Sequence, residues 1–320
     1  MRVLVVTNLW PTPERPASGG FVRDQVEALR ALDGVEIELF TFGTGARAYL
    51  RAARDLRRRY RGERFDVVHA HYGLAGWSAL ALRGAPHVVT FHGTDLAHPK
   101  VGPLSRALAR LIALPAPVSA TLARTELGEL AATRRVAILP CGVNLERFGR
   151  IDRVAARERL GLEPDAAYLL FPADPSRPEK RADRARALAS AAGVELLHYD
   201  RRPPEEIPFL INAANAVLVT SEREGFGLAA LEALACDVPV LATDVGIAPL
   251  ALHGVHGTLC APFDEGAWLA ALEPHLADRD PRIDGRGRAA LFDRNRLAAR
   301  VLRAYRDVLG TGEAAPPAPL

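Results

Sequence analysis

The chain of 320 residues is 49% hydrophobic and 25% charged, and it carries a formal net charge of +3. This balance is typical of a folded globular protein of about two domains and excludes a disordered, collagen-like or coiled-coil chain. We expect no secretory leader and no membrane-spanning helix, which needs roughly 18 consecutive apolar residues, and therefore a cytoplasmic location. The three cysteines, Cys141, Cys236 and Cys260, lack disulfide or zinc spacing, so buried thiols are expected.

Strand and helix patterns alternate along the first half of the chain. Short apolar runs predict strands at Val3–Thr7, Val35–Phe42, Asp66–Ala70, His87–Phe91, Ala116–Ser119 and Val136–Leu139. Helix-period patterns separate them near Phe21–Leu32 and at Ala46–Tyr60, Leu74–Leu82, Pro103–Leu111 and Ala120–Ala131. This alternation predicts a parallel sheet covered by helices on both faces.

The same alternation restarts after a polar stretch. Strands are predicted at Tyr168–Phe171, Glu195–Tyr199, Ala216–Thr220, Val238–Thr243 and Thr258–Ala261. Helices are predicted at Arg181–Ala192, Glu205–Ala214, Phe226–Ala235 and Asp284–Leu309. We therefore predict an α/β protein with two Rossmann-like doubly wound domains facing each other across a cleft. The expected division is a first domain at 1–148, a linker at 149–165, a second domain at 166–283, a helix at 284–309 that returns to the first domain, and a disordered tail at 310–320.

Charge is divided unevenly between the two halves. Residues 1–150 hold 21 Lys and Arg against 13 Asp and Glu, a net +8, and residues 151–320 hold 20 against 25, a net −5. The basic half indicates an anionic contact, such as a membrane surface or a phosphorylated acceptor. Lys100 and Lys180 are the two lysines of the chain, so in this arginine-rich sequence a lysine position carries more information than an arginine position.

The strongest basic cluster is the segment Arg47–Arg64. Its eight arginines stand against Asp55 and Glu63. Two interpretations stay open: a helix face that contacts anionic lipid at the inner side of a membrane, or a solvated helix in a chain biased toward arginine. Partners are otherwise expected to be small molecules and not nucleic acid.

Two glutamates, Glu224 and Glu232, lie eight residues apart after the strand predicted at Ala216–Thr220. Eight helical residues rise roughly 12 Å, too far for the paired carboxylates of a glycoside hydrolase at about 5–10 Å, and better suited to two parts of one long ligand. Between them Gly225, Phe226 and Gly227 would expose N–H groups at a helix N-terminus, which favours a diphosphate. The spacing alone also fits two solvated surface glutamates.

This segment, E-G-F-G-L-A-A-L-E-A-L-A, resembles the signature region of the GT4 family of retaining glycosyltransferases, which have the GT-B fold. Further segments resemble motifs of that family in the same order. They are the glycine loop Gly19–Gln25, the H-G-x-D turn at Phe91–Asp95, the segment Leu139–Phe148 before the domain linker, and the basic turn Arg177–Lys180. The resemblance covers the chain from Val3 to Tyr305.

The resemblance implies roles in binding a donor. Glu232 would accept hydrogen bonds from ribose hydroxyls, and Glu224 would lie near the transferred sugar, since a carboxylate can accept two hydroxyls. Lys180 would stabilise charge on the leaving diphosphate. The family's arginine five positions before this lysine is Pro175 here, so Arg177 is its nearest substitute. The donor set is completed by the turn Gly225, Phe226, Gly227 and Leu228.

The resemblance also assigns residues of the first domain. Gly19 and Gly20 would approach phosphate or acceptor closely at a helix N-terminus, and His92 would lie near the transferred sugar through its neutral imidazole or its carbonyl. Two residues depart from the family pattern: Leu250 replaces a frequent glutamate, and Cys141 replaces the asparagine of a P-N-G turn.

No metal and no cofactor are expected. Asp278-Arg279-Asp280 has the D-x-D spelling of metal-dependent glycosyltransferases but stands in a polar loop, so we interpret it as coincidence. His69 and His71 flank Ala70, and we expect them to alternate faces so that at most one points into the cleft, which excludes a metal pair.

We therefore expect a retaining, metal-independent glycosyltransferase of hexosyltransferase type. Its donor would be a UDP- or GDP-sugar, and its acceptor a carbohydrate, a lipid-linked molecule or a small molecule. Two alternatives stay open: a GT-B nucleotide-sugar epimerase, and a catalytically idle paralogue that binds sugar nucleotides.

Overall fold

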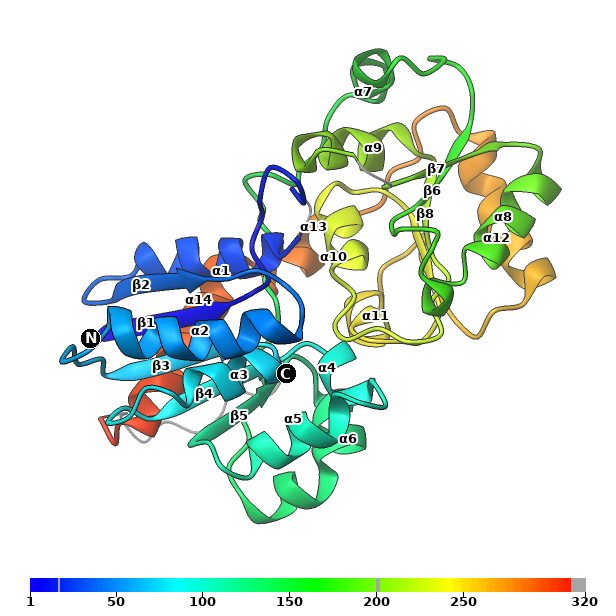
Figure 1. The fold of residues 1–320 in the computed structure, drawn as a ribbon. Coiled ribbons are helices and arrows are strands. Elements are labelled where there is room, and N and C mark those ends of the chain that lie inside the picture. The colour runs from blue at the N-terminus through cyan, green and yellow to red at the C-terminus, as the bar shows by residue number, and fades with distance from the viewer. Residues whose placement is uncertain (17, 200–201, 312–320) are drawn as a thin grey trace. The chain divides into compact units, whose positions relative to one another are not determined.

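A computed structural model describes residues 1–16, 18–199 and 202–311 (Figure 1). Within these residues the chain forms two compact units. Unit 1 comprises residues 1–12, 18–141 and the chain from Asn295 onward, and unit 2 comprises residues 13–16 and 142–294. The disordered tail expected at 310–320 lies outside the described residues beyond Thr311.

Unit 1 is built on a parallel sheet with strand order β2-β1-β3-β4-β5. Its strands are β1 (Arg2–Thr7), β2 (Glu36–Thr41), β3 (Val67–His71), β4 (His87–Phe91) and β5 (Leu114–Pro117). Its helices are α1 (Gly20–Arg30), α2 (Ala46–Arg59), α3 (Gly73–Ala79), α4 (Thr94–Ala97), α5 (Gly102–Ala109), α6 (Ala120–Thr133) and α14 (Arg294–Val308).

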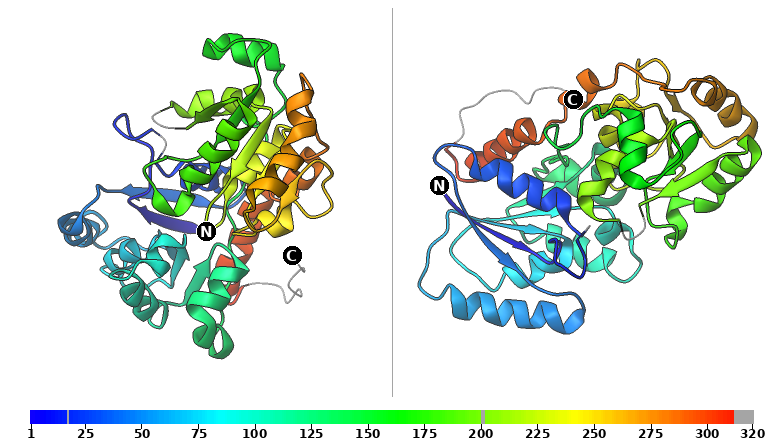
Figure 2. Two further views of the ribbon diagram at one scale, coloured as in Figure 1. Left: turned by 90° about the vertical axis from the view of Figure 1, so that its right-hand side faces the viewer. Right: turned by 90° about the horizontal axis from the view of Figure 1, so that it is seen from above.

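Side chains of the central strand β1 alternate between two hydrophobic cores. Leu4 and Val6 pack in a core with α2, α3 and α5, whereas Val3 and Val5 pack in a core with α1 and α14. This alternation follows from the two-residue period of a strand, so a strand buried on both faces is a continuous apolar run. Figure 2 shows the result: α1 and α14 cover one face of this sheet, and α2 lies on the other.

The strand expected at Val136–Leu139 does not form, although the segment runs beside β5. Ala137 N–H donates to the Pro115 carbonyl, and Leu139 N–H donates to the Pro117 carbonyl, both at 3.1 Å. Because the two prolines have no N–H, they cannot return a hydrogen bond to the segment. The pairing is therefore one-way, and the prediction of a sixth strand is wrong.

Unit 2 repeats the architecture with strand order β10-β9-β8-β6-β7, again all parallel. Its strands are β6 (Tyr168–Phe171), β7 (Glu195–His198), β8 (Ala216–Val219), β9 (Val240–Ala242) and β10 (Leu259–Cys260). Its helices are α7 (Arg153–Leu160), α8 (Ala182–Ala192), α9 (Ile207–Ala213), α10 (Leu228–Ala235), α11 (Ala248–Ala251), α12 (Glu265–Ala277) and α13 (Arg286–Ala290), with short 3-10 turns η1 (Pro178–Lys180) and η2 (Pro204–Glu206). The predicted class of two parallel-sheet α/β domains is confirmed.

The helix predicted at Asp284–Leu309 is divided in two. Between α13 and α14 the backbone pairs with Val143, whose N–H donates to the Phe292 carbonyl and whose carbonyl accepts from Arg294 N–H, both at 2.9 Å. These bonds to a distant segment replace the helical bonds there. Helix α12 was not predicted, and the expected linker 149–165 contains α7, which begins at the side-chain cap Asp152. Among the described residues, no helix is both long and apolar enough to cross a bilayer.

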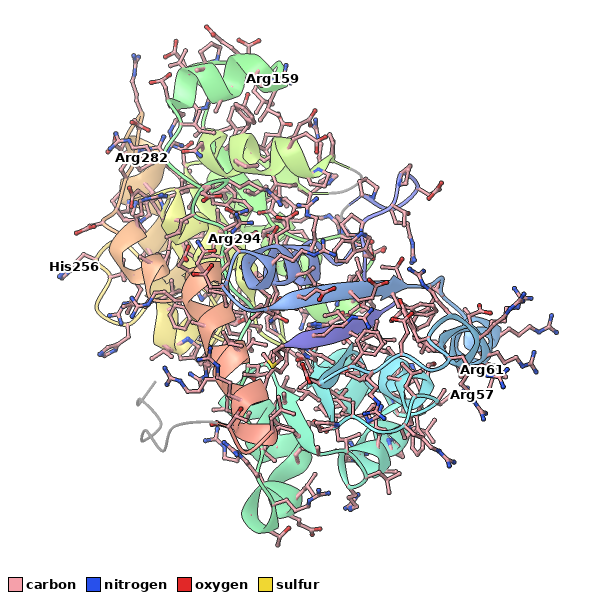
Figure 3. The ribbon with its side chains drawn as sticks, turned by 90° about the vertical axis from the view of Figure 1, so that its left-hand side faces the viewer. Arg57, Arg61, Arg159, His256, Arg282 and Arg294 are labelled. Atoms are coloured by element: carbon pink, nitrogen blue, oxygen red, sulfur yellow. The ribbon has the colours of Figure 1, made fainter. Side chains whose placement is uncertain are left out.

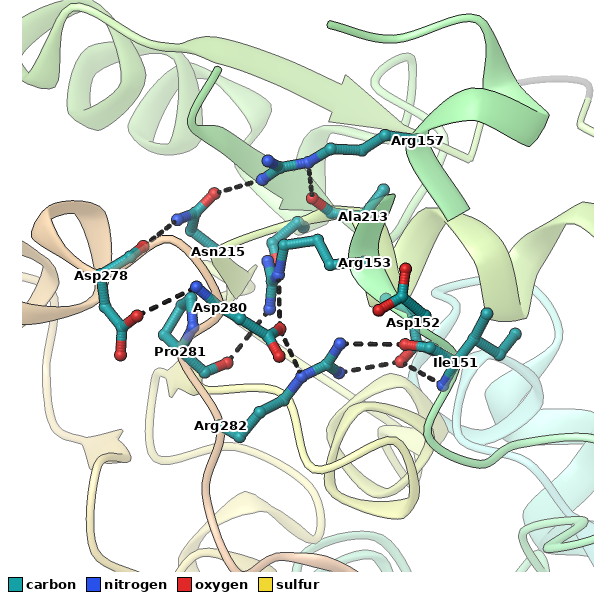
Figure 4. Close-up of polar contacts among 12 residues, drawn as sticks. Ile151, Asp152, Arg153, Arg157, Ala213, Asn215, Asp278, Asp280, Pro281 and Arg282 are labelled. Atoms are coloured by element: carbon teal, nitrogen blue, oxygen red, sulfur yellow. Dashed lines mark hydrogen bonds and ion pairs between the residues drawn. The ribbon is translucent and has the colours of Figure 1, made fainter. Parts of the chain in front are cut away.

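A buried arginine network joins α7 to the segment that follows α12 (Figure 4). The Arg153 side chain is only 3% exposed. It donates to the carboxylate of Asp280 at 2.9 Å and to the carbonyls of Ala214 and, at 3.1 Å, Pro281. Arg282 binds the same carboxylate at 2.8 Å. Burial lowers the pKa of Arg153 to about 10, so the guanidinium stays charged at neutral pH and every acceptor around it receives a charge-assisted bond.

Replacing Arg153 by alanine is expected to lower the free energy of unfolding by about 2–4 kcal/mol, because the carbonyls of Ala214 and Pro281 lose this donor, whereas Asp280 keeps its bond from Arg282. Arg150 is a matched control, since it contacts the same Asp280 at 3.4 Å with a side chain that is 59% exposed. Arg150→Ala should cost at most about 1 kcal/mol. Chemical denaturation of the two variants measures the difference, and equal losses would contradict a structural role for the buried network.

Candidate functional site

The loops that follow β6 and β8 are joined by hydrogen bonds in unit 2. The Thr220 hydroxyl, directly after β8, donates to the carbonyls of Lys180 at 3.1 Å and Arg181 at 3.0 Å. Glu222 N–H donates to the Glu179 carbonyl at 2.9 Å. These bonds fix the turn η1 against the loop that leads to α10, so side chains from two strand ends are held side by side.

Lys180 and Glu224 meet across this junction. The Lys180 Nζ lies 2.6 Å from each carboxylate oxygen of Glu224, and the Ser221 hydroxyl donates to Oε1 of the same carboxylate at 2.7 Å. The two charged side chains are 12% and 11% exposed. The structure therefore brings together two residues that stand 44 positions apart and that the sequence singled out independently.

The turn between Glu224 and α10 is held by close backbone packing. Gly227 takes a φ of 93° as the N-cap of α10, a conformation that favours glycine. Ile247 N–H donates to the Phe226 carbonyl at 2.7 Å, and a Cβ on Gly246 would lie 2.4 Å from that same oxygen. The helix consequently begins at Leu228, two residues later than predicted.

Glu232 lies in the second turn of α10, near Tyr199 and Cys236. Burial and then the Glu232 carboxylate raise the pKa of Tyr199 well above its usual value. The same two causes, in the same order, raise the pKa of Cys236 to about 12. Glu232 is half-buried beside these groups, so its carboxylate is not freely solvated.

Two arginines around η1 contact three different carboxylates. Arg177 donates to Glu179 at 2.9 and 2.6 Å and is about half exposed, so its contacts stay within its own turn. Arg181, with a φ of 55°, reaches both Asp183 and Glu222. Sequence analysis missed Arg181, because nothing in an arginine-rich chain distinguishes it; its left-handed backbone is a property of the fold.

In unit 1, the buried carboxylate of Asp95 organises the loops after β3 and β4. It accepts hydrogen bonds from the N–H groups of Gly73 at 2.9 Å and of His92 and Gly93 at 3.0 Å. Burial raises the pKa of Asp95 to about 6, although each of these N–H groups favours the ionised form. The H-G-x-D turn is thereby tied to the start of α3, and Asp95 positions His92 through its backbone.

Three histidines lie together at these strand ends. His71 Nδ1 is 3.2 Å from His92 Nε2, and the rings of His69 and His71 have centroids 4.4 Å apart. The prediction that His69 and His71 alternate faces is wrong, because residues two apart in a strand share a face. Burial lowers the pKa of His92 to about 3, so its imidazole is neutral at physiological pH. His69 is anchored by Tyr305 of α14 through a 2.6 Å contact to Nδ1.

The two glycines of the first loop have different constraints. Gly19 is the N-cap of α1 with a φ of 71°, and a Cβ there would lie 2.3 Å from the carbonyl carbon of Leu9. Gly20 is the first helical residue, and a Cβ there would meet nothing within 4 Å. Only Gly19 is therefore required by the close approach of two backbone segments.

Among the residues that the structure describes, no group of three or more His, Cys, Asp or Glu side chains could hold a metal ion. In the D-x-D segment, the Asp280 carboxylate is bound by Arg153 and Arg282. Of the cysteines, Cys141 and Cys236 are buried and Cys260 is half-buried. Burial raises the pKa of Cys141 to about 12, which makes its thiol unreactive at neutral pH.

Comparison with known proteins identifies relatives of both units. The family model described as Glycosyltransferase Family 4 matches residues 1–147, and the model described as Glycosyl transferases group 1 matches residues 175–289. The chain is 31% identical to a D-inositol 3-phosphate glycosyltransferase of Thermobispora bispora, covering 78% of this chain and 72% of the relative. A protein of the same name from Frankia alni is 32% identical, covering 77% and 75%.

Solved structures show the same fold at lower identity. Sucrose-phosphate synthase from Thermosynechococcus elongatus matches with a TM-score of 0.75 and 20% identity, over 97% of this chain and 99% of that chain. Anabaena HepE in complex with UDP and glucose matches with a TM-score of 0.71 and 17% identity, over 96% and 100%. These matches confirm the predicted GT-B fold.

We expect Gly19→Ala to lower the free energy of unfolding by at least about 2 kcal/mol, because the new Cβ combines left-handed strain with a clash against fixed backbone. Gly20→Ala, its neighbour at an open helical position, should change stability by no more than about 1 kcal/mol and in the stabilising direction. Urea titration of both variants separates the two effects. If Gly19→Ala unfolds like the parent chain, the loop is not constrained as described.

Proposed function

The chain belongs to glycosyltransferase family 4, and we propose that it transfers a sugar from a UDP- or GDP-sugar to a hydroxyl of its acceptor, with retention of configuration at the anomeric carbon. The observation that carries this proposal is the partly buried pair of Lys180 and Glu224 at two strand ends, with Glu232 on the helix that follows. Ligands of parallel α/β sheets bind at the carboxyl ends of strands, which is where these side chains converge.

The donor would span these three charges. Glu232 is suited to the ribose hydroxyls, because a carboxylate accepts hydrogen bonds from two of them. The N–H groups at the start of α10, after Gly227, favour the diphosphate. Glu224 would contact hydroxyls of the transferred sugar. The Anabaena structure contains UDP and glucose, which supports a uridine nucleotide as the first donor to test.

Lys180 would exchange its partner when the donor binds. In the ligand-free chain its ammonium neutralises Glu224, whereas an incoming diphosphate offers a stronger and more concentrated negative charge. Moving toward the phosphates frees the Glu224 oxygens to accept sugar hydroxyls, while Ser221 keeps that carboxylate in place. Negative charge on the diphosphate grows as the bond to the anomeric carbon breaks, so the lysine stabilises the transition state more than the ground state.

We propose that the transfer uses neither a covalent nucleophile nor a metal ion. The acceptor hydroxyl would attack from the leaving-group side, and the departing phosphate oxygen would take its proton. Positive charge comes from Lys180 and the N–H groups at helix starts, and the neutral His92 of unit 1 would contact the sugar. Gly19 and Gly20 at the start of α1 would approach the acceptor. Arg177 would assist the diphosphate in place of the family arginine, which is Pro175 here.

We propose a phosphorylated acceptor, and D-inositol 3-phosphate as the first to test. The names of the relatives carry this choice, and the net charge of +8 on residues 1–150 is compatible with a phosphate group. Two other functions fit the same fold: a nucleotide-sugar epimerase and a sugar-nucleotide-binding paralogue without activity. Both differ from the proposal in giving no acceptor product.

The test is proton NMR of the reaction with UDP-glucose, and in parallel GDP-mannose, in the presence of the acceptor and EDTA. The expected result is nucleoside diphosphate release coupled to a product with the anomeric configuration of the donor. Replacing Lys180 by glutamine should lower kcat on the order of a hundredfold, because one preorganised positive charge is lost at the leaving group.

Lys100, the other lysine of the chain, is exposed in unit 1 and provides the matched control. Lys100→Gln should keep the parent kcat. Lys180→Gln leaves the carboxylate of Glu224 without its partner, so circular dichroism of both variants checks that the loss of activity does not come from unfolding. An inverted product would contradict retention, loss of activity in EDTA would contradict metal independence, and epimerised donor without acceptor product would favour the epimerase.

A further inference from the structure

Helix α2 has one face in the core of unit 1 and one in solvent. Ala52 and Leu56 are buried against the sheet. The eight arginines of the segment 47–64 are all exposed, namely Arg47, Arg51, Arg54, Arg57, Arg58, Arg59, Arg61 and Arg64. Figure 3 shows Arg57 and Arg61 pointing away from the rest of unit 1. By the 3.6-residue period, Arg54, Arg57 and Arg58 lie opposite the buried face.

An apolar side chain lies among these arginines. Leu50 is 68% exposed, the highest value among the large hydrophobic residues that the structure shows exposed. The helical period places it on the same outward face as Arg54. Leu50 would not stabilise a basic surface that contacts only water. The arginines alone therefore do not explain why an apolar side chain is exposed here.

The apolar character continues onto α3. Most residues of α3 are buried, and the chain has no charged residue from Tyr72 to Leu82. Trp77 is 37% exposed, and its indole N–H donates to the Leu104 carbonyl of α5 at 3.1 Å. On the other side, the Ser78 hydroxyl donates to the Tyr49 carbonyl of α2 at 2.9 Å. The three helices therefore form one continuous layer.

The pattern is completed by Leu104 of α5 and by Leu111, which follows the end of that helix; they are 50% and 64% exposed. Seven large hydrophobic side chains are exposed in the described chain, and four of them lie on or beside α2, α3 and α5. The seven are Leu50, Trp77, Leu104, Leu111, Val154, Leu250 and Leu291. Such clustering on one layer marks an interaction surface, whereas single exposed leucines scattered over a protein do not.

Helix α14, on the opposite face of the sheet, shows what the arginine-rich composition alone produces on a helix surface. It exposes Arg296, Arg303 and Arg306, but none of the seven exposed large hydrophobic residues of the described chain lies on it. Arginine bias in the sequence thus produces basic surface in both places. Exposed apolar groups accompany it only on the outer layer of α2, α3 and α5, which we call the α2–α3–α5 face.

We propose that the α2–α3–α5 face binds an anionic lipid bilayer, with Trp77 and the exposed leucines at the depth of the headgroups and the α2 arginines on lipid phosphates. Guanidinium groups pair with phosphate oxygens in a bidentate manner, and tryptophan is favoured at membrane interfaces. A soluble polyanion would satisfy the arginines but would leave the apolar side chains in water. Nothing in this proposal depends on the identity of the donor.

The test is cosedimentation of the full chain with vesicles of phosphatidylcholine, with and without phosphatidylglycerol, at low and moderate salt. The chain should bind the anionic vesicles and not the neutral ones. The variant Arg54→Gln, Arg57→Gln and Arg58→Gln should bind roughly a hundredfold more weakly, from the contribution of each basic residue near a charged surface. The control is the same triple exchange at Arg296, Arg303 and Arg306, which removes equal charge from the opposite face and should bind like the parent.

Tryptophan fluorescence reports whether the apolar part enters the interface. Of the three tryptophans, Trp268 is fully buried and Trp10 is half-buried against the core that contains α1 and α14, on the other face of the sheet. A blue shift on adding anionic vesicles is therefore expected to come from Trp77 and to disappear in Trp77→Phe. Leu50→Gln should weaken binding without changing net charge. Equal losses in the two arginine triples, a persistent shift in Trp77→Phe, or binding to heparin without binding to vesicles would each overturn the proposal.

Discussion

The candidate donor site depends on one ion pair, between Lys180 and Glu224. Taking both charges out of water is costly, and a partly buried pair of this kind adds little to stability compared with apolar side chains of the same size. It persists because Thr220 and Ser221 fix the loops on either side, so each charge has its partner in place. A pair that contributes little to folding but holds a cation ready beside a helix N-terminus fits a site that exchanges one anion for another.

In unit 1, the loops that follow the strands are held together by a different interaction. There a single buried carboxylate, Asp95, is satisfied by three backbone N–H groups and joins the loops after β3 and β4. The loops after strands would otherwise be the mobile parts of an α/β unit. In unit 1 the Asp95 carboxylate holds the backbone of His92 in place. In unit 2 the Lys180 ammonium holds the carboxylate of Glu224.

The apolar periodicity of the sequence predicted most strands and helices to within a few residues, because buried parallel strands are unbroken apolar runs. It failed where partners come from distant segments. The prolines of β5 decide that 136–139 is not a strand, and the bonds to Val143 decide where α14 begins. Family resemblance pointed to Lys180 and Glu224 separately, but their contact and the backbone of Arg181 arise only in the folded chain.

Arginine illustrates the same limit, since identical side chains are buried structural donors at Arg153 and exposed surface at Arg57. The central claim concerns the donor, and hydrogen–deuterium exchange with and without saturating UDP or GDP tests it most directly. The account predicts slower exchange in residues 178–182 and 221–232 with at least one of the two nucleotides. Unchanged exchange in both segments, or protection confined to unit 1, would contradict the assignment of Lys180, Glu224 and Glu232 to the donor.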